Sequence, residues 1–220
     1  MANNKLIINL HGIGKPVRTL ELGEQDYIIG APLLEYLLDM AVDKKTIITV
    51  DDGNISDINI ILPNLIERNL KAMFFIPVGK IGQKGYLREE DIITLQQEGM
   101  VIGSHGVNHV NWRNLNNNEL KYEVTESKRL LENILGSPVI DIACPFGAYD
   151  RRVLQFIKKA GYQKTYTSDK GMACLDDWLI SRNTLSINDN QKSISKLLES
   201  NFSFKQQIFI TLKKGVKRWR

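Results

Sequence analysis

Short apolar runs of strand length alternate along this chain with amphipathic stretches of helix length. The strand candidates lie at residues 6–9, 46–50, 72–76, 101–103, 139–143, 164–167 and 178–181. The clearest helical pattern covers 118–135, where Leu120, Val124 and Leu131 recur at helical spacing and Gly136 provides a stop signal. Further helices are expected from 56 or 57 to 69, from 89 to 98 and from 151 to 160, the last capped by Asp150.

This alternation predicts an α/β fold built on a parallel sheet. Seven strand candidates in 220 residues suit a small or incomplete barrel, and an open sheet fits the pattern almost as well. The sequence shows no internal repeat and no obvious linker. We therefore expect one barrel domain over 1–200, with 201–220 as a basic amphipathic tail of the same domain.

Polar side chains with catalytic chemistry follow several of the expected strands, at the point where each strand ends. His11 follows the first strand, Asp51 and Asp52 the second, His105 the fourth and Arg182 the seventh. Barrels of this kind build their active sites at the C-terminal ends of the strands. These residues are therefore expected to meet at one mouth of the barrel.

The most informative pattern joins the acids Asp51 and Asp52 with the histidines His105 and His109. Two imidazoles and one carboxylate fill three sites of a divalent metal and leave one open, and the second carboxylate supplies a base. The spacing of four predicts that both histidines lie on one face of a helical turn. The alternatives are an ordinary Asp-Gly turn and two unrelated surface histidines. Adjacent acids after a buried strand favour the metal, because it relieves their repulsion.

The composition is that of an ordinary globular protein, with 43% apolar and 25% charged residues. Residues 201–220 hold six basic and no acidic side chains, so subtracting six from the formal charge of +4 leaves the remainder at −2. No basic face for nucleic acid is expected upstream of the tail. The N-terminal residues lack the pattern of a signal peptide, and no apolar stretch is long enough to span a bilayer. We therefore expect a cytoplasmic protein, with Cys144 and Cys174 as free thiols.

These residues resemble the motifs of the polysaccharide deacetylase family, also called the NodB-homology family or carbohydrate esterase family 4. Its motif Thr-Phe-Asp-Asp-Gly is matched by residues 49–53, His-Ser/Thr-x-x-His by 105–109, and Arg-x-Pro-Phe/Tyr-Gly in part by 143–147. A loose match to its Asp-x-x-Asp-Trp motif lies at 176–178. The resemblance covers roughly residues 6–185, and the order of the motifs makes the combination specific. It implies a distorted (β/α)7 barrel, an incomplete relative of the TIM barrel.

The resemblance also implies a reaction. Asp52, His105 and His109 would bind the metal, usually zinc in this family, and Asp51 would be the general base toward the metal-bound water. The backbone N–H of Phe146 would complete the oxyanion hole. Hydrolysis of the C–N bond of an N-acetyl sugar would give acetate and a free amine. The ligand set alone also accepts cobalt, nickel, manganese or iron.

Two departures from the family motifs change this expectation. The third-motif arginine is Ala143 here, which marks a subgroup with an Ala-x-Pro-Phe-Gly segment, and Arg182 is either the replacement cation or part of a surface salt bridge. The family's late histidine, its general acid, is absent, because no histidine follows His109. His11 would then protonate the amine, hold substrate or act as a structural cap. In the remaining alternative, Asp51 shuttles the proton itself.

Two further residues carry two interpretations each. Cys144 adjoins the oxyanion segment, and we expect it to pack in the core rather than act as a nucleophile, since metal hydrolysis needs none. Trp178 either lines a sugar-binding wall or packs in the core.

The tail at 201–220 gives a hypothesis about partners. Its apolar residues on roughly one side of a helical projection are Phe204, Ile208, Leu212 and Trp219. Basic amphipathic helices bind anionic membrane surfaces, whereas the alternative is an ordinary terminal helix packed on the barrel. Membrane contact would place the protein at the inner face of the membrane and make a lipid-linked sugar a natural substrate.

Together these observations predict a metal-dependent sugar N-deacetylase. The cytoplasmic address favours a nucleotide-linked or lipid-linked precursor of a cell-surface glycan over mature peptidoglycan or chitin. A deformylase or small-molecule amidase on the same metal site is one alternative. A catalytically inactive carbohydrate-binding barrel is another, motivated by the missing arginine and late histidine and opposed by the intact aspartate and histidine pairs.

Overall fold

The structure is a computed structural model that describes residues 4–44, 46–199, 212, 215–217 and 219. Its strands are β1 (Asn4–Leu10), β2 (Ile47–Asp51), β3 (Ala72–Ile76), β4 (Val101–Ser104), β5 (Asp141–Ala143), β6 (Lys164–Thr167), β7 (Met172–Cys174), β8 (Leu179–Ser181) and β9 (Asn183–Thr184). Its α-helices are α1 (Ala31–Lys44), α2 (Leu62–Glu67), α3 (Glu89–Gln97), α4 (Asn117–Leu135), α5 (Arg151–Lys159) and α6 (Gln191–Glu199). All seven predicted strands are present, within two residues at each end.

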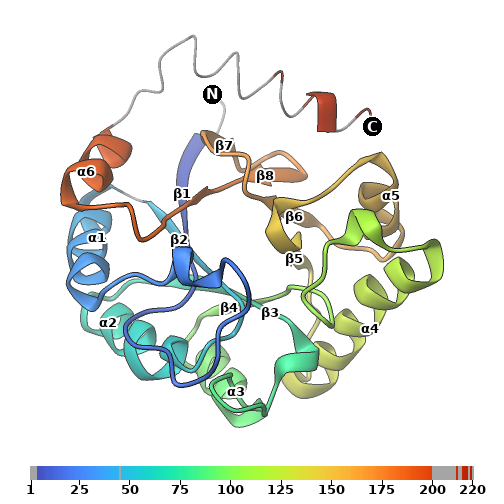
Figure 1. Cartoon of the computed structure of the whole chain (residues 1–220), viewed down its shortest axis with the longest axis horizontal. Coiled ribbons are helices and arrows are strands. Elements are labelled where there is room, and N and C mark those ends of the chain that lie inside the picture. Colours follow the sequence, from blue (N-terminus) through green and yellow to red (C-terminus); the bar gives the residue numbers. More distant parts are fainter. Residues whose placement is uncertain (1–3, 45, 200–211, 213–214, 218, 220) are drawn as a thin grey trace.

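The strands form a nearly closed, barrel-like sheet with the α-helices around its outside (Figure 1). Strands β1 to β6 pair in parallel in chain order, and β8 follows β6. The barrel closes through one short segment, because β8 pairs with β6 while β9, two residues further on, pairs with β1. Arg182 is the single residue between β8 and β9, so it lies at this seam. The structure therefore confirms the predicted barrel rather than the open sheet.

Helix α4 shows why the clearest sequence pattern is also accurate. Asn116 accepts hydrogen bonds from the N–H groups of Asn118 and Glu119, and the Glu119 side chain accepts from the Asn116 N–H, which forms a capping box. The helix ends at Gly136, whose φ of 63° suits glycine. Its apolar stripe is buried against the sheet and α3.

The helix expected from 56 or 57 to 69 is present from 57 to 67, but its first turn and its cap differ from the expectation. A π-helical turn, η2 (Asp57–Ile61), precedes α2, and the Ser56 side chain does not cap either of them. The Ser56 hydroxyl instead accepts the backbone N–H of Ile13, 43 residues earlier in the chain. Tertiary hydrogen bonding has replaced the local cap that the sequence suggests.

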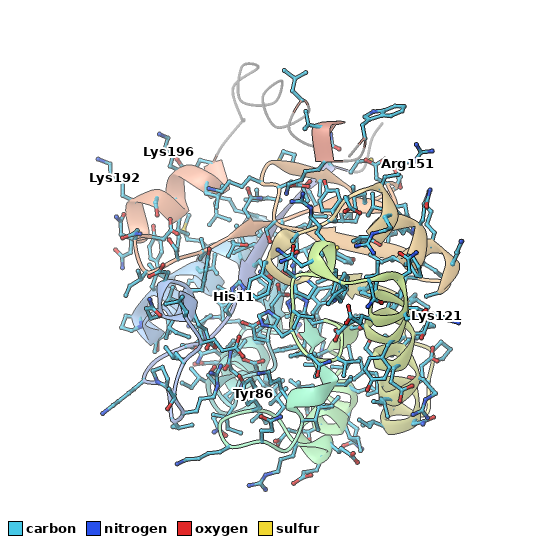
Figure 2. The ribbon with its side chains drawn as sticks, turned by 45° about the vertical axis from the view of Figure 1, so that its right-hand side comes forward. His11, Tyr86, Lys121, Arg151, Lys192 and Lys196 are labelled. Carbon is cyan, nitrogen blue, oxygen red and sulfur yellow. The ribbon has the colours of Figure 1, made fainter. Side chains whose placement is uncertain are left out.

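The outer surface and the barrel mouth differ in character. Figure 2 shows Lys121, Arg151, Lys192 and Lys196 projecting from the outer helices, whereas His11 lies toward the centre of the molecule. Two apolar clusters fill the protein: a large one between the helices and the sheet, and a small one that includes Ile7, Phe75 and Tyr166. Within the described residues, no helix combines the length and hydrophobicity that crossing a bilayer requires.

Candidate metal and catalytic site

Three potential metal ligands converge at the C-terminal ends of β2 and β4. Asp52 directly follows β2, His105 directly follows β4, and His109 lies four residues further on. The Nε2 atoms of His105 and His109 lie 3.5 Å and 3.2 Å from Oδ1 of Asp52, and one ligand atom from each residue lies within 4.8 Å of the other two. This spacing allows one cation to contact all three residues.

The two histidines do not share a helical turn, so this part of the sequence-based prediction is wrong. Residues 105–109 form a loop in which Gly106 has a φ of 79° and His109 a φ of 52°. The carboxylate of Glu123 on α4 holds this loop, because it accepts hydrogen bonds from the backbone N–H groups of Val107 and Asn108. These left-handed turns bring both imidazoles to one point without helical geometry.

His105 is presented as a neutral ligand. Its Nδ1 lies 2.9 Å from the backbone oxygen of Ala143, so Nδ1 carries the proton and Nε2 faces Asp52. Burial lowers the pKa of His105 to about 4, although the charges of Asp51 and Asp52 act in the opposite direction. A neutral imidazole with a free Nε2 lone pair is the form that binds a metal.

The donor set fits a divalent metal ion. Oδ1 of Asp52 is buried and accepts no hydrogen bond from the described residues. The acceptor Nε2 of His105 and the unpaired Oδ1 of Asp52 therefore face each other, and Nε2 of His109 lies beside the same oxygen, an arrangement that a cation satisfies. Asp52 also holds a φ of 79°, and such strained backbone is typical of functional sites.

Asp51, the neighbouring acid, forms hydrogen bonds with Arg182 at the barrel seam. The guanidinium of Arg182 donates to both its carboxylate oxygens, at 2.6 Å and 2.7 Å, and the side-chain amide of Asn9 donates to Oδ2 at 3.0 Å. Burial alone would raise the pKa of Asp51, but the charge and hydrogen bonds of Arg182 hold this pKa well below its usual range. Asp51 is therefore ionised and fixed in orientation, and its Oδ2 lies 3.9 Å from Nε2 of His105.

Phe146 lies in the 3₁₀ turn η5 (Pro145–Gly147), which follows β5, and adopts a left-handed φ of 58°. Phe146 is 63% exposed, and its ring lies 4.6 Å from the His109 ring, measured between centroids. Its backbone N–H donates to none of the described protein groups. A free donor beside the metal ligands can stabilise a negative oxygen.

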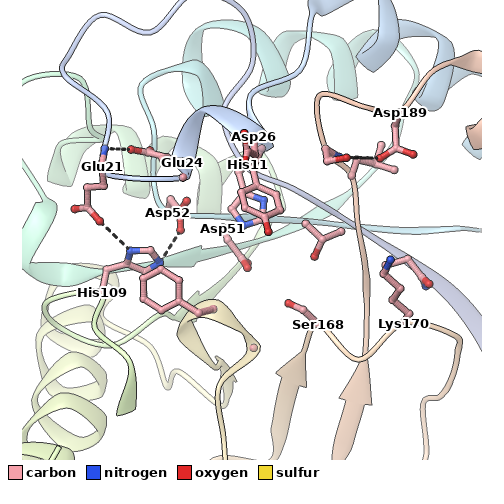
Figure 3. A pocket seen from close by; sticks show the side chains of 18 of the residues that line it. His11, Glu21, Glu24, Asp26, Asp51, Asp52, His109, Ser168, Lys170 and Asp189 are labelled. Atoms are coloured by element: carbon pink, nitrogen blue, oxygen red, sulfur yellow. Dashed lines mark hydrogen bonds and ion pairs between the residues drawn. The ribbon is translucent and has the colours of Figure 1, made fainter. Parts of the chain in front are cut away.

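His11 lies at the same mouth, directly after β1. Its ring packs 5.1 Å from the Tyr27 ring, and its buried Nδ1 has no hydrogen-bond partner among the described residues. It lines the same cavity as Asp51 and Asp52. The structure thus brings His11 to the candidate site, facing the two acids (Figure 3).

The cavity over these residues has a volume of about 930 Å³. Figure 3 shows Asp51, Asp52, His11 and His109 on one side, with residues that include Ser168, Lys170 and Asp189 on the other. Its size exceeds the needs of a single acetyl group. The wall opposite the metal ligands can therefore contact the remainder of a larger substrate.

Residues 40–165 match the family model described as polysaccharide deacetylase. The chain belongs to the polysaccharide deacetylase family. The Bacillus subtilis (strain 168) protein YxkH, assigned by its name to the polysaccharide deacetylases, is 31% identical over 134 residues, which are 61% of this chain and 48% of YxkH. A chitooligosaccharide deacetylase of Azorhizobium caulinodans is 24% identical over 117 residues, 52% of this chain and 53% of that protein. The chain thus spans about half the length of these relatives.

Solved structures share the fold of this polysaccharide deacetylase family member. The Streptococcus pyogenes deacetylase PplD, in complex with acetate, matches 91% of this chain and 100% of its own at 20% identity, with a TM-score of 0.79. BC0361, a polysaccharide deacetylase from Bacillus cereus, matches 90% of this chain and 70% of its own at 20% identity, with a TM-score of 0.78. At these identities the likeness shows a common barrel.

Three residues that the sequence reasoning missed support this family member's site. The side-chain oxygen of Asn9 accepts hydrogen bonds from Arg182 at 2.8 Å and from the Thr49 hydroxyl at 2.7 Å. The Glu123 carboxylate accepts a hydrogen bond from the loop that carries the two histidines. Asn9 and Thr49 are polar residues inside strands β1 and β2, and that interruption of an apolar run was the available signal. Glu123 had no such signal, because a glutamate on an amphipathic helix looks like an ordinary surface residue.

Cys144 and Trp178 have no catalytic or substrate-binding role in the candidate site. Both cysteines are free, and burial raises the pKa of the Cys144 thiol to about 12, so it is no thiolate at neutral pH. Trp178 donates its ring N–H to the backbone oxygen of Tyr162 and borders a separate groove with Arg151 and Lys158. It does not line the cavity over the metal ligands.

Proposed function

We propose that this chain hydrolyses an N-acetyl group on a sugar with the help of a divalent metal ion. The observation that carries the proposal is the position of the ionised Asp51–Arg182 pair beside three converging potential ligand atoms on Asp52, His105 and His109. Membership of the polysaccharide deacetylase family supports the same reaction. The C–N bond would be cleaved by water, giving acetate and the free amine.

The position of each residue in the site indicates its role in the reaction. When bound by Asp52, His105 and His109, a divalent metal polarises the acetyl carbonyl and lowers the pKa of water. Asp51 accepts the proton of the attacking water, and Arg182 holds the Asp51 carboxylate in place for that transfer. The Phe146 N–H donates to the carbonyl oxygen as it gains negative charge.

The leaving nitrogen needs a proton, and His11 is placed to give it. His11 is the one histidine at this mouth that does not face Asp52 as a candidate ligand, and its Nδ1 is unpaired among the described residues. The alternative is that Asp51 passes on the proton it has accepted. Both routes leave the same products, so only kinetics of His11 variants separates them.

The test is acetate release by the metal-loaded full chain, measured on N-acetylated sugars beside two variants. His105→Ala should lose both metal and turnover, because it removes a ligand. Asp51→Asn should keep about one equivalent of metal and lose about 10²- to 10⁴-fold in kcat, because it removes the base. Elemental analysis supplies the metal content of each protein. Activity that survives in both variants would contradict the proposal.

Two alternatives predict different results in the same assay. A deformylase or small-molecule amidase would turn over N-formyl or ring-amide compounds faster than N-acetyl sugars. An inactive carbohydrate-binding barrel would bind sugars, detectable by calorimetry, without metal-dependent turnover. Comparing the three compound classes at equal metal loading therefore decides among them.

The finer parts of the hypothesis stay predictions. We propose a nucleotide-linked or lipid-linked sugar precursor in the cytoplasm as substrate, and zinc as the metal. Peripheral membrane contact is supported by the exposed Leu212, Val216 and Trp219. Phe204 and Ile208 lie outside the described residues, as does most of 201–220. Activity on precursors against polymeric chitin or peptidoglycan, and fractionation of cells, test these points.

A further inference from the structure

Lys217, from the C-terminal segment, reaches the wall of the cavity. Its Nζ donates to Oδ1 of Asp169 at 2.6 Å and to the backbone oxygen of Gly147 at 3.2 Å, and it lies 5.0 Å from the centre of the Tyr149 ring. The side chain is 28% exposed, while that of Asp169 is 1% exposed. This contact joins the end of the chain to the turn that carries Phe146.

Asp169 is held as a buried, ionised anchor. Besides Lys217, the hydroxyls of Tyr149 and Thr167 donate to its Oδ2, at 2.6 Å and 2.9 Å. Burial acts to raise the pKa of Asp169, but these donors and the ammonium charge lower it overall. A buried carboxylate with this many donors is rigid, so a group bound to it is fixed in turn.

The turn that Lys217 contacts needs support from outside itself. Phe146 and Gly147 hold consecutive left-handed φ angles of 58° and 59°, which are unfavourable for phenylalanine. The bonds within the turn are local, from Gly147 N–H to Cys144 and from Ala148 N–H to Pro145. Gly147 also packs so closely on Ser168 that an added Cβ would lie 2.9 Å from the Ser168 Cβ. Lys217 adds a hydrogen bond from a distant segment to this strained turn.

We propose that Lys217, anchored by Asp169, is a positioning residue that holds Gly147 and thereby aims the Phe146 N–H at the substrate carbonyl oxygen. This inference rests on the proposed function for its catalytic consequence. An oxyanion donor acts only when its direction is correct, so small displacements cost rate. Lys217 is therefore expected to affect the rate of the chemical step, while substrate binding changes little.

The test compares Lys217→Met with Lys217→Arg and with Lys192→Met. Lys192 projects from α6, does not line the cavity and has no hydrogen-bond or ion-pair partner among the described residues, so it is the control (Figure 2). Lys217→Met should lower kcat about tenfold with KM changed less than about twofold, a fraction of the cost of deleting an oxyanion donor. Lys217→Arg should recover most of kcat, and Lys192→Met should leave both constants unchanged.

A second measurement does not depend on activity. Hydrogen–deuterium exchange of the peptide that contains 144–148 should accelerate in Lys217→Met and not in Lys192→Met, while metal content and melting temperature confirm that each variant folds. If the wild type releases no acetate but this exchange effect appears, the proposed function fails and the positioning contact stands. An unchanged exchange rate overturns the positioning contact. A loss confined to KM overturns it too, because it would show that Lys217 binds substrate directly.

Discussion

Arg182 and Asp51 form a fully buried, bidentate ion pair, with guanidinium-to-carboxylate distances of 2.6 Å and 2.7 Å. The arginine comes from the barrel seam between β8 and β9, and the aspartate from the end of β2. A cation that the third motif lacks at Ala143 thus contacts Asp51 from the segment between β8 and β9. The barrel closure and the orientation of the candidate base depend on the same residue.

The first prediction concerns this pair. Arg182→Met should lower kcat at least 100-fold and destabilise the protein by about 3–5 kcal/mol, because it leaves the Asp51 carboxylate buried without its partner. The double variant Asp51→Asn with Arg182→Met should regain much of the stability and none of the activity. Urea unfolding and acetate release measure the two effects. Equal stability of the single and double variants would contradict the argument.

The second prediction separates His11 from the metal ligands. His11→Asn should retain the full metal content, because His11 does not belong to the converging trio, but should lower kcat by about 10²-fold if it gives the proton to the leaving amine. The loss should shrink for substrates whose leaving amine is a weaker base, since these need protonation less. A uniform loss across such substrates would assign His11 to binding or structure instead.

The third prediction concerns Glu123, which holds the loop between the two histidines. Glu123→Gln should weaken metal affinity by about 10- to 100-fold, the range found when groups that orient metal ligands are removed. Glu126→Gln on the same helix is the control, because Glu126 pairs with Arg129 at the surface. Competition with a chelator measures both affinities. Identical affinities would show that the loop keeps its shape without the carboxylate.

The alternating strands and helices and their parallel sheet could be predicted from the residue pattern, whereas the closure of the barrel and several parts of the site could not. Strand ends place His11, Asp51, Asp52, His105 and Arg182 at one mouth because parallel strands align their C-terminal ends. Strand β9 has only two residues and is too short to be recognised from a sequence pattern, yet it closes the barrel on β1. Chain closure is a tertiary property that no local pattern expresses.

The histidine loop shows the limit of reasoning from spacing. A separation of four residues fits a helical turn, but the loop instead follows the carboxylate of Glu123 and the left-handed backbone at Gly106. The contact with Glu123 joins this loop to α4, 15 or 16 residues further along the chain, so no local spacing expresses it. The residue types therefore predicted that the histidines and the aspartates converge. The loop conformation that brings them together could be seen only in the structure.

The fourth prediction is a pH dependence of stability in the metal-free protein. Burial lowers the pKa of His105 to about 4, from an ordinary value of 6.5, so between these pH values the unfolded chain binds a proton that the folded chain does not. Stability from this group is therefore complete above pH 6.5 and is lost as pH falls toward 4, by roughly 3 kcal/mol. Thermal unfolding with chelator at several pH values measures it.

Asp57 makes a control variant necessary for that measurement. Its carboxyl is fully buried, and burial raises its pKa well above the usual range, so its contribution is present at low pH and is lost as pH rises. The changes in stability with pH that arise from His105 and from Asp57 therefore have opposite signs. The difference between wild type and His105→Gln cancels Asp57 and isolates the histidine. A difference that does not vary with pH would show that His105 is protonated alike in both states.

The last prediction concerns the C-terminal segment. Leu212, Val216 and Trp219 are 64%, 57% and 82% exposed, whereas Lys217 points inward to Asp169. An exposed apolar group among basic residues fits an anionic lipid surface. Wild type should therefore co-sediment with vesicles that contain anionic phospholipid, less so at high salt, and the double variant Leu212→Ser with Trp219→Ser should not.

The inward lysine supplies the matched control for this experiment. Lys217→Met should retain vesicle binding, because that ammonium is already paired with Asp169 and contributes little to the outer face. If Lys217→Met abolishes binding while the apolar double variant keeps it, charge from the inward lysine would be the determinant and the exposed apolar residues would have no part. Equal binding to neutral vesicles would exclude recognition of anionic lipid. Binding that depends on both anionic lipid and Trp219 would place the mouth of the cavity beside a membrane surface, where a lipid-linked sugar can enter.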